Sequence, residues 1–218
     1  TKEPVSAKES IRQTRIQKLA ELADKGINPY PYAFDKDADA KDLQEKYKDL
    51  PAGEETEDFY SVAGRVMAIR NSGMFIDLMD TTGKIQIFSH KENMDPEMIK
   101  TLKLVDIGDI LGFYGSIRRT PRGELSIKAK SFKMLSKSLL PLPNKQISEE
   151  KLEQLKMYHT MSDTETKYRQ RYVDLIVNER TRDTFRKRSL IILERLRDLA
   201  TQASNGTYDA ETREAMQA

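Results

Sequence analysis

The sequence predicts a mainly β fold with helical extensions: a five-stranded barrel, preceded by a helical arm and followed by further helices. Two observations carry this prediction. At residue 59 the spacing of apolar residues changes from a helical period of about 3.6 to a strand period of about two. From there the chain reads as three strands, a helix and two more strands, separated by short turns that contain glycine.

The segment before the barrel, residues 1–58, is predicted to be a helical arm. Apolar side chains recur at helical intervals within residues 6–26, and Gly26 is typical of the end of a helix. Two prolines in the following sequence, INPYPYAF, favour an extended passage. A short polar helix is then expected over residues 38–50.

The barrel itself is predicted over residues 59–143. Its helix begins at Asp95, a good capping residue, and at Pro96, which suits the first position of a helix. Three strands, a helix and two strands over about 80 residues are the order of an OB-fold, a barrel that commonly binds oligonucleotides. The five strands are expected over residues 59–70, 74–80, 83–90, 108–119 and 123–135.

The remaining chain is predicted to be a linker followed by helices. Residues 136–147 contain two prolines and are typical of a linker. Helical patterns follow over residues 148–158 and 162–203, and the sequence SNG then breaks the pattern. The last dozen residues are polar, and we expect them to be helical.

Composition excludes several classes of site. The chain of 218 residues has no cysteine, which excludes disulfides and thiolate metal sites, and its two histidines, His90 and His159, exclude a histidine-rich zinc site. We interpret both as lone surface residues. No apolar run approaches the roughly 18–20 residues of a membrane span, and the charged N-terminus lacks the apolar core of a secretion signal. A soluble, cytoplasmic protein without membrane partners is therefore expected.

Charge is distributed unevenly along the chain. The net charge of +2 conceals a basic middle, with +4 over residues 61–135 and +4 over residues 136–190. Residues 1–60 carry −4 and residues 191–218 carry −2. A mildly basic middle is consistent with a nucleic-acid surface, although it is far from a histone-like tail.

Strand alternation predicts a binding face on the second and third strands. If the isoleucines of both strands point inward, Phe75 and Gln86 point outward from neighbouring strands. An exposed ring can stack on an unpaired base and an amide can bind a base edge, while Arg70 before the turn can bind base or phosphate. The alternative is that Phe75 belongs to a minor apolar cluster and Gln86 is merely solvated.

The predicted hairpin between the last two strands carries further candidates. Arg118, Arg119 and Arg122 frame its tip, where they would either contact phosphate or keep the loop soluble. Glu124 begins the last strand and would either read a base amino group or protect a strand edge. Downstream, Arg169 within YRQRYVD also fits an ordinary charged helix face. We find no catalytic constellation and no metal site in the sequence.

Several motifs together resemble the N-terminal part of a class II lysyl-tRNA synthetase, over residues of about 8–190. They are VAGRVMAIRNSGMFIDLMDTTGKIQIF, GDILGFYGSIRRTPRGELSIKAKSFKMLSKSLLPLP, YRQRYVDLIVN and TFRKRS. They occur in the order and at the spacing of that family, and YRQRYVDL distinguishes the lysine enzymes from their aspartate and asparagine relatives. The combination is highly specific.

The resemblance implies an OB-fold that binds the uridine-rich anticodon of lysine tRNA. It implies that Phe75 stacks on the central anticodon base, that Gln86 and Arg70 hydrogen-bond to bases, and that Glu124 belongs to the same site. Residues 144–174 would link this domain to a class II catalytic domain. The full-length enzyme attaches lysine to tRNA with ATP and magnesium and dimerises through its catalytic domain; no cofactor is expected in this chain.

The C-terminal sequence departs from the family. Residues 175–218 would be a truncated or aberrant start of the catalytic domain, because motifs 2 and 3 are absent and Arg213 stands where motif 1 has proline. Residues of about 192–217, around RDLATQASNGTY, instead resemble the N-terminal region of bacterial flagellin. The segment is either a foreign tail or a diverged motif 1. We expect the chain alone to be catalytically inactive and, without an intact motif 1, monomeric.

Two other functions remain open at this point. The chain would be either a free-standing OB-fold paralogue that binds other RNAs, or a protein-interaction chimera whose flagellin-like tail mediates assembly. RNA binding that depends on the lysine anticodon would argue against the free-standing paralogue. Deletion of residues 191–218 tests the protein-interaction chimera.

Overall fold

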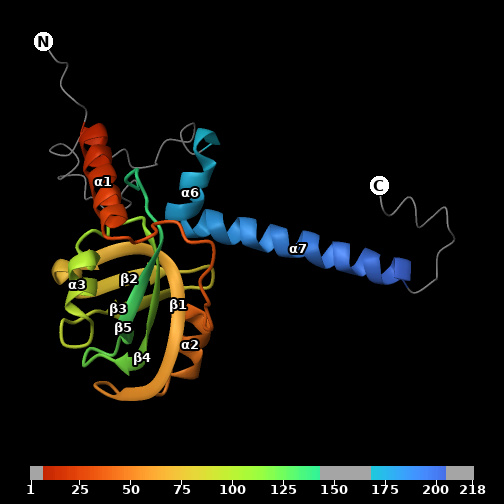
Figure 1. The fold of residues 1–218 in the computed structure, drawn as a ribbon. Coiled ribbons are helices and arrows are strands. Elements are labelled where there is room, and N and C mark those ends of the chain that lie inside the picture. The colour runs from red at the N-terminus through yellow and green to blue at the C-terminus, as the bar shows by residue number, and fades with distance from the viewer. Residues whose placement is uncertain (1–6, 143–167, 205–218) are drawn as a thin grey trace, which may run out of the picture. The chain divides into compact units, whose positions relative to one another are not determined.

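The structure is a computed structural model that describes residues 7–142 and 168–204. The chain divides into two compact units, Thr1–Leu142 and Pro143–Ala218, and each is considered by itself. The first unit contains a barrel with helices around it (Figure 1). Its strands are β1 (Glu55–Arg70), β2 (Phe75–Met79), β3 (Lys84–Phe88), β4 (Ile110–Arg119) and β5 (Leu125–Ser136).

The five strands close into a ring in the order β1-β2-β3-β5-β4, and β4 pairs back to β1. Neighbours are antiparallel except β3 and β5, which are parallel. β1 pairs with two strands: its C-terminal part pairs with β2 and its N-terminal part pairs with β4. The predicted five-stranded barrel is confirmed, and β1 begins at Glu55 rather than at residue 59.

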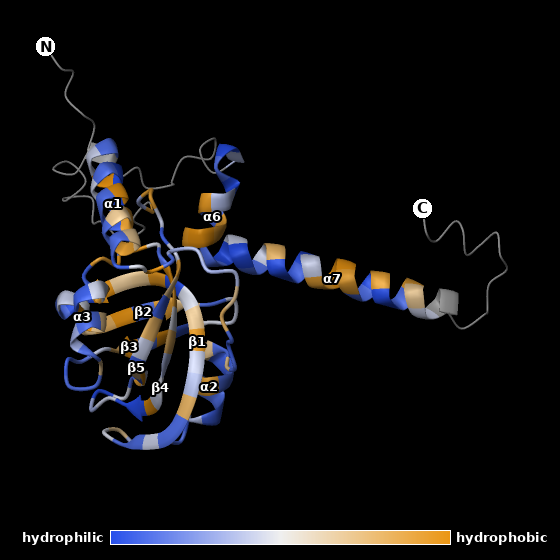
Figure 2. Ribbon diagram, in the orientation of Figure 1, coloured by the Kyte–Doolittle hydropathy of each residue, from blue (hydrophilic) through white to orange (hydrophobic). Residues whose placement is uncertain are grey.

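Alternation along the strands fills the barrel with aliphatic side chains, as the sequence pattern predicts. Ile76 and Leu78 of β2 and Ile85 and Ile87 of β3 are all buried, and Figure 2 shows the matching apolar bands on the strands. The barrel core continues into the flanking helices, where the side chains of Leu22 and Leu43 are fully buried. The remaining large side chains that are fully buried are Val62, Val66, Leu111, Phe113, Ile117, Ile127 and Met134.

The helices of the first unit lie where the sequence predicts them. Gly26, which follows the first helix, has a φ of +70°, the left-handed conformation expected at a helix end. The Asp95 carboxylate accepts a hydrogen bond of 2.8 Å from the amide of Glu97 and caps the third helix. The helices are α1 (Ala7–Asp24), α2 (Ala40–Lys46) and α3 (Pro96–Leu102).

A buried cluster of charges joins the end of β5 to the loop before β4. The ammonium group of Lys137 donates to the carboxylates of Asp106 (2.6 Å) and Asp109 (2.8 Å) and to the carbonyl of Leu104 (2.8 Å). Burial alone would raise the pKa of Asp106, but the bonds from Lys137 and Lys18 outweigh it and leave that pKa below its usual value. The first residues of the expected linker are therefore part of the barrel unit.

Arg15 of α1 also binds the segment that follows β5. Its guanidinium donates to the carbonyls of Ser138 (2.9 Å) and Leu140 (3.0 Å) and to the carbonyl of Ile107 (3.0 Å). An arginine with several carbonyl partners can be buried at low cost, and Arg15 is buried. These bonds tie the helical arm to the barrel.

Asp80 fastens α2 to the turn between β2 and β3. One carboxylate oxygen accepts from the amide of Ala40 (2.9 Å), and the other accepts from the amides of Thr82 (2.7 Å) and Gly83 (2.8 Å) and from the Thr82 hydroxyl (2.8 Å). Burial opposes ionisation, but these donors outweigh it and hold the pKa of Asp80 at about 2.

The low pKa of Asp80 predicts a specific loss of stability in acid. A carboxylate whose pKa is depressed on folding stabilises the protein above its unfolded pKa of about 3.9, and that contribution disappears as the pH falls. We expect the free energy of unfolding of the wild type to fall between pH of about 4 and about 2 more steeply than that of Asp80→Asn. Urea unfolding followed by circular dichroism measures both slopes, and equal slopes would contradict the assignment.

The described part of the second unit is a pair of helices, α6 (Arg171–Val177) and α7 (Glu179–Ser204), separated by the extended residue Asn178. The expected helical pattern over residues 162–203 is confirmed for the part that the structure describes. The helix expected over residues 148–158 and the last dozen residues lie outside the described residues. Large apolar side chains on α7 are exposed: Leu190, Ile191, Ile192, Leu193 and Leu196. Figure 2 shows apolar segments along this helix.

Candidate nucleic-acid interface

Outward-facing side chains of β2 and β3, together with Arg70 at the end of β1, form one face of the barrel, which we call the β2–β3 face. Its members are Arg70, Phe75, Asp77, Lys84, Gln86 and Phe88. The strand register determines which of these side chains lie side by side. Phe75 lies beside Phe88, and Asp77 lies beside Gln86. Because successive side chains alternate between the two sides of a strand, these residues point out while the isoleucines between them fill the barrel. The predicted orientation of Phe75 and Gln86 agrees with this geometry.

Gln86 is nevertheless not the exposed amide that the alternation pattern predicts. Its exposed fraction is 8%, and its side-chain oxygen accepts a 2.8 Å hydrogen bond from the hydroxyl of Ser126 on β5. The parallel pairing of β3 with β5 places Ser126 directly beside Gln86, while buried Asp77 flanks it on β2. Neighbours on both sides therefore cover the amide and fix its orientation.

Asp77 orients two cations on the β2–β3 face. Its carboxylate oxygens lie 2.6 Å from the guanidinium of Arg70 and 2.8 Å from the ammonium of Lys84. Asp77 is buried, whereas the side chains of Arg70 and Lys84 are about half exposed. The arrangement presents two positive groups to solvent while one carboxylate holds them in place.

Aromatic rings continue along the same face. The rings of Phe75 and Phe88 lie 5.3 Å apart, and the ring of His90 stacks on Phe88 at 5.8 Å with an interplanar angle of 4°. The guanidinium of Arg118 covers Phe88 at 4.4 Å. The interpretation of His90 as a lone surface residue is therefore wrong, since the strand end brings it onto Phe88.

The three arginines of the β4–β5 hairpin have different surroundings. Arg118 reaches the β2–β3 face and lies 3.5 Å from the carboxylate of Glu55, which also pairs with Lys128 at 2.7 Å. Arg122 is exposed in the turn. Glu124, also exposed, directly precedes β5 and shares its alternation with Ser126.

Arg119 is directed away from this face. Its guanidinium donates to the carbonyls of Tyr47 (2.7 Å), Lys48 (3.2 Å) and Gly123 (2.7 Å). Tyr47 is the C-terminal capping residue of α2, so Arg119 adds a donor at the helix end, where the Tyr47 carbonyl also accepts a 3.1 Å hydrogen bond from the amide of Leu50. These bonds indicate a structural role for Arg119, and the expected phosphate contact stays a prediction for Arg118 and Arg122.

We expect Arg119→Ala to lower the free energy of unfolding by about 1–3 kcal/mol, because it removes the hydrogen bonds that a charged group donates to three carbonyls. Arg122→Ala removes the same charge from the same hairpin and should change stability by less than about 0.5 kcal/mol. Thermal unfolding followed by circular dichroism compares the two variants. A loss no greater in Arg119→Ala than in Arg122→Ala would mean that the three bonds contribute nothing.

A strained turn precedes the aromatic strand. Asn71 and Ser72 have φ values of 50° and 55°, which residues other than glycine rarely adopt. The hydroxyl of Ser89 donates to the carbonyl of Gly73, and its amide donates to the carbonyl of Met74 at 2.8 Å. These bonds hold the turn between Arg70 and Phe75.

Comparison with known proteins agrees with this architecture. Residues 60–135 match the family model of the OB-fold nucleic acid binding domain. The barrel is an OB-fold. Curated relatives extend the similarity beyond this domain: the chain is 44% identical over 180 residues to the lysine–tRNA ligase of Sinorhizobium medicae (strain WSM419), which covers 83% of this chain and 34% of the relative.

Two further relatives show similar values. The lysine–tRNA ligase of Thermosynechococcus vestitus (strain NIES-2133 / IAM M-273 / BP-1) is 47% identical over 188 residues, covering 83% of this chain and 35% of the relative. The chloroplastic/mitochondrial lysine–tRNA ligase of Arabidopsis thaliana is 45% identical over 195 residues, covering 87% and 30%. These ligases are homologues of the chain, and the chain spans about a third of their length. The flagellin-like similarity of residues 192–217 stays a prediction.

Sequence reasoning missed several members of the β2–β3 face. Phe88 has the same alternation as Gln86, so the pattern that selected the amide also marks this ring. Asp77 shares the alternation of Phe75, but only the register shows that it lies between two cations.

Among the described residues, no group of three or more histidines or carboxylates could hold a metal ion. The helices of this part of the chain also lack the combination of length and apolar character that a membrane span requires.

Proposed function

We propose that the OB-fold unit binds the anticodon of lysine tRNA, as the N-terminal part of a lysine–tRNA ligase. One observation carries the proposal: an aromatic ring, a fixed amide and an oriented guanidinium lie on one outer face of the barrel. The homologous proteins are lysine–tRNA ligases, which supports lysine tRNA as the RNA. Attachment of lysine with ATP and magnesium belongs to the complete enzyme in this proposal.

Each group on the face suits one part of the task. Phe75 offers a ring on which a base can stack, an interaction worth about 1–3 kcal/mol per base. The hydroxyl of Ser126 binds the amide oxygen of Gln86, so the amide NH2 is the end directed to a carbonyl of a base such as uracil. Asp77 fixes the guanidinium of Arg70 for hydrogen bonds to a base or phosphate.

Binding to an anticodon stem-loop tests the proposal directly. The full chain would be titrated at one stated salt concentration with a stem-loop that carries the lysine anticodon. The control stem-loop has the three anticodon bases changed. We expect a preference of about tenfold or more, which corresponds to about 1.4 kcal/mol. Equal affinity for both would favour the free-standing paralogue, which binds single strands without regard to the anticodon.

Glu55 is expected to compete with RNA phosphate. Its carboxylate pairs with Lys128 and Arg118 beside Phe88, so these cations are partly neutralised in the free protein. We expect Glu55→Gln to tighten stem-loop binding about twofold to fivefold, since exposed ion pairs contribute up to about 1 kcal/mol. The salt dependence should steepen by about 0.7 for each additional phosphate contact.

The matched control is Glu57→Gln, which removes the same charge from an exposed residue of the same strand. If Glu57→Gln tightens binding as much as Glu55→Gln, the gain reflects net charge alone. Release of Lys128 and Arg118 would then play no part in it.

The oligomeric state and the C-terminal segment stay predictions. We propose that this chain is monomeric, although α7 exposes several apolar side chains in the described part of the second unit. The complete ligase would dimerise through its catalytic domain. The protein-interaction alternative predicts that deletion of residues 191–218 abolishes an assembly property and preserves RNA binding.

A further inference from the structure

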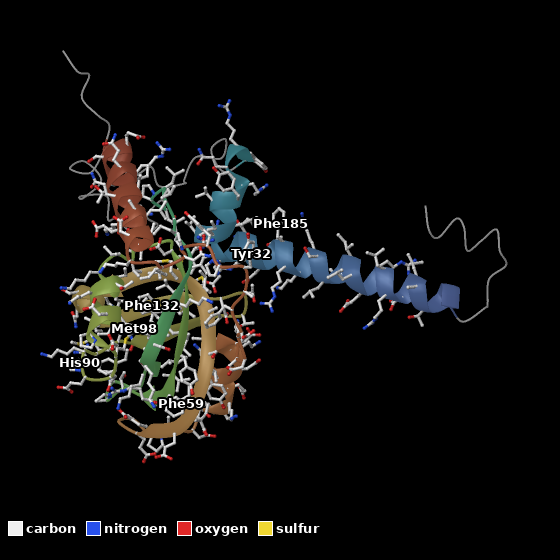
Figure 3. All side chains as sticks on the ribbon, viewed as in Figure 1. Tyr32, Phe59, His90, Met98, Phe132 and Phe185 are labelled. Carbon is white, nitrogen blue, oxygen red and sulfur yellow. The ribbon has the colours of Figure 1, made fainter. Side chains whose placement is uncertain are left out.

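A second aromatic cluster lies on the barrel, outside the residues considered so far. The rings of Phe59 on β1 and Tyr114 on β4 stack at 5.5 Å with an interplanar angle of 24°. The ammonium of Lys130 on β5 lies 4.3 Å from the centre of the Phe59 ring. Tyr114 is 42% exposed, and Phe59 lies at the end of the barrel away from α1 (Figure 3). We call these three residues the β1–β4 platform.

The strand register makes the platform continuous with the β2–β3 face. Phe88 pairs with Lys128, Lys128 pairs with Ser116, and Ser116 pairs with Phe59. Neighbouring strands lie about 4.8 Å apart, so these residues form one row around the outside of the barrel. Arg118, two positions beyond Ser116 on β4, covers Phe88. Aromatic rings therefore lie at both ends of this row, and the cations Lys128 and Arg118 lie between them.

The platform has a defined boundary on its other side. The ring of Phe34 lies over Gly112, where even a β-carbon would come within 2.5 Å of it. Gly112 precedes Tyr114 on the outer side of β4, so the extended segment closes the open surface there. A bound RNA strand can therefore continue along the row of residues toward Arg118.

The charges of the platform suit a polyanion. Lys130 belongs to it, and Lys128 and Arg118 lie between it and Phe88. The acidic residues of β1 nearby are Glu55, which pairs with those two cations, Glu57, which is exposed, and Asp58, whose carboxylate accepts a hydrogen bond from the hydroxyl of Tyr47. Stacked rings with adjacent lysines are the elements by which OB-folds hold single strands, with site sizes of about 4–16 nucleotides.

We propose that the β1–β4 platform is a second base-stacking site, which binds a base of the anticodon loop that flanks the three anticodon bases. The inference rests on the proposed function, since it extends the same RNA path. The exposed side of Tyr114 takes the base, Phe59 supports the ring from behind, and Lys130 lies near the phosphate. Stacking at this site is independent of base identity, because every base has an aromatic face.

Abasic substitutions in the stem-loop test the platform. Each loop nucleotide outside the lysine triplet is replaced in turn by an abasic residue, and binding is measured with wild type, Tyr114→Ala and Tyr114→Phe. We expect Tyr114→Ala to weaken binding of the intact stem-loop by about fivefold or more, as lost stacking predicts. It should cause no further loss with the stem-loop that lacks the flanking base. Tyr114→Phe should bind as the wild type does.

Tyr32→Ala is the matched control, because it makes the same substitution at a fully exposed tyrosine outside the strands. The inference is overturned if Tyr114→Ala binds like Tyr32→Ala, or if its loss is equal for every abasic stem-loop. The wild-type preference for the lysine triplet is a separate readout. If that preference is absent, the proposed function fails; if it is present without an effect of Tyr114→Ala, only the platform fails.

Discussion

Phe75→Ala is expected to weaken binding of the lysine anticodon stem-loop by about 1–3 kcal/mol, through the loss of base stacking. The ring is partly exposed and packs on Phe88 at 5.3 Å, so its removal also costs stability. An aromatic pair contributes about 0.5–1.5 kcal/mol, which a folded domain can lose without unfolding. Fluorescence anisotropy gives the affinity, and circular dichroism confirms the fold.

Phe75→Leu separates stacking from packing at this position. Leucine retains an apolar contact with Phe88 but presents no aromatic face to a base. We expect Phe75→Leu to bind nearly as weakly as Phe75→Ala while it unfolds nearer to the wild-type temperature. Wild-type affinity in Phe75→Leu would mean that a base does not stack on this ring. Complete unfolding of Phe75→Ala would mean that Phe75 is a core residue.

Lys137→Met is expected to cause the largest loss of stability, about 3–5 kcal/mol, because it leaves the buried carboxylate of Asp109 without its cation, whereas Asp106 keeps its ion pair with Lys18. The side chains of Lys137 and Asp109 are both 0% exposed. Asp109 retains only the amides of Asp106 and Ser138 as donors. Urea unfolding measures the loss, which is large relative to the total stability of about 5–15 kcal/mol that is typical of folded proteins.

Three further variants interpret the result: Lys103→Met, Asp109→Asn and the double variant Lys137→Met/Asp109→Asn. Lys103→Met removes the charge of an exposed lysine and should be nearly neutral. The double variant Lys137→Met/Asp109→Asn removes the buried charge as well as its partner, so it should recover part of the loss. If Lys137→Met is as stable as Lys103→Met, or if the double variant is the sum of the single losses, the buried pair does not stabilise the fold as proposed.

The sequence predicts those parts of the fold that depend on local pattern. Alternation along β2 and β3 places Ile76 and Ile87 inside the barrel and Phe75 outside it, because each strand needs only its own residues to define its two sides. The capping of α3 by Asp95 is equally local. The closed ring follows from the order of the elements, since that order matches one small barrel.

The surroundings of individual site residues depend on partners that are distant in the chain. Gln86 is covered because parallel pairing places Ser126 beside it, forty residues later. Arg119 is drawn from the hairpin tip to the end of α2 by carbonyls of Tyr47 and Lys48. A single sequence contains no signal for either contact. Lys137 is a similar case, since a lysine before a proline-containing segment is typical of a solvated linker.

The closed ring also sets when the barrel can form during synthesis. β1, β2 and β3 can pair as soon as they leave the ribosome, because they are neighbours in sequence. The N-terminal half of β1 must wait for β4, and β3 must wait for β5. Contacts of such long sequence separation slow folding and leave strand edges open meanwhile. The nascent chain is therefore most vulnerable to aggregation between the emergence of β3 and that of Lys137.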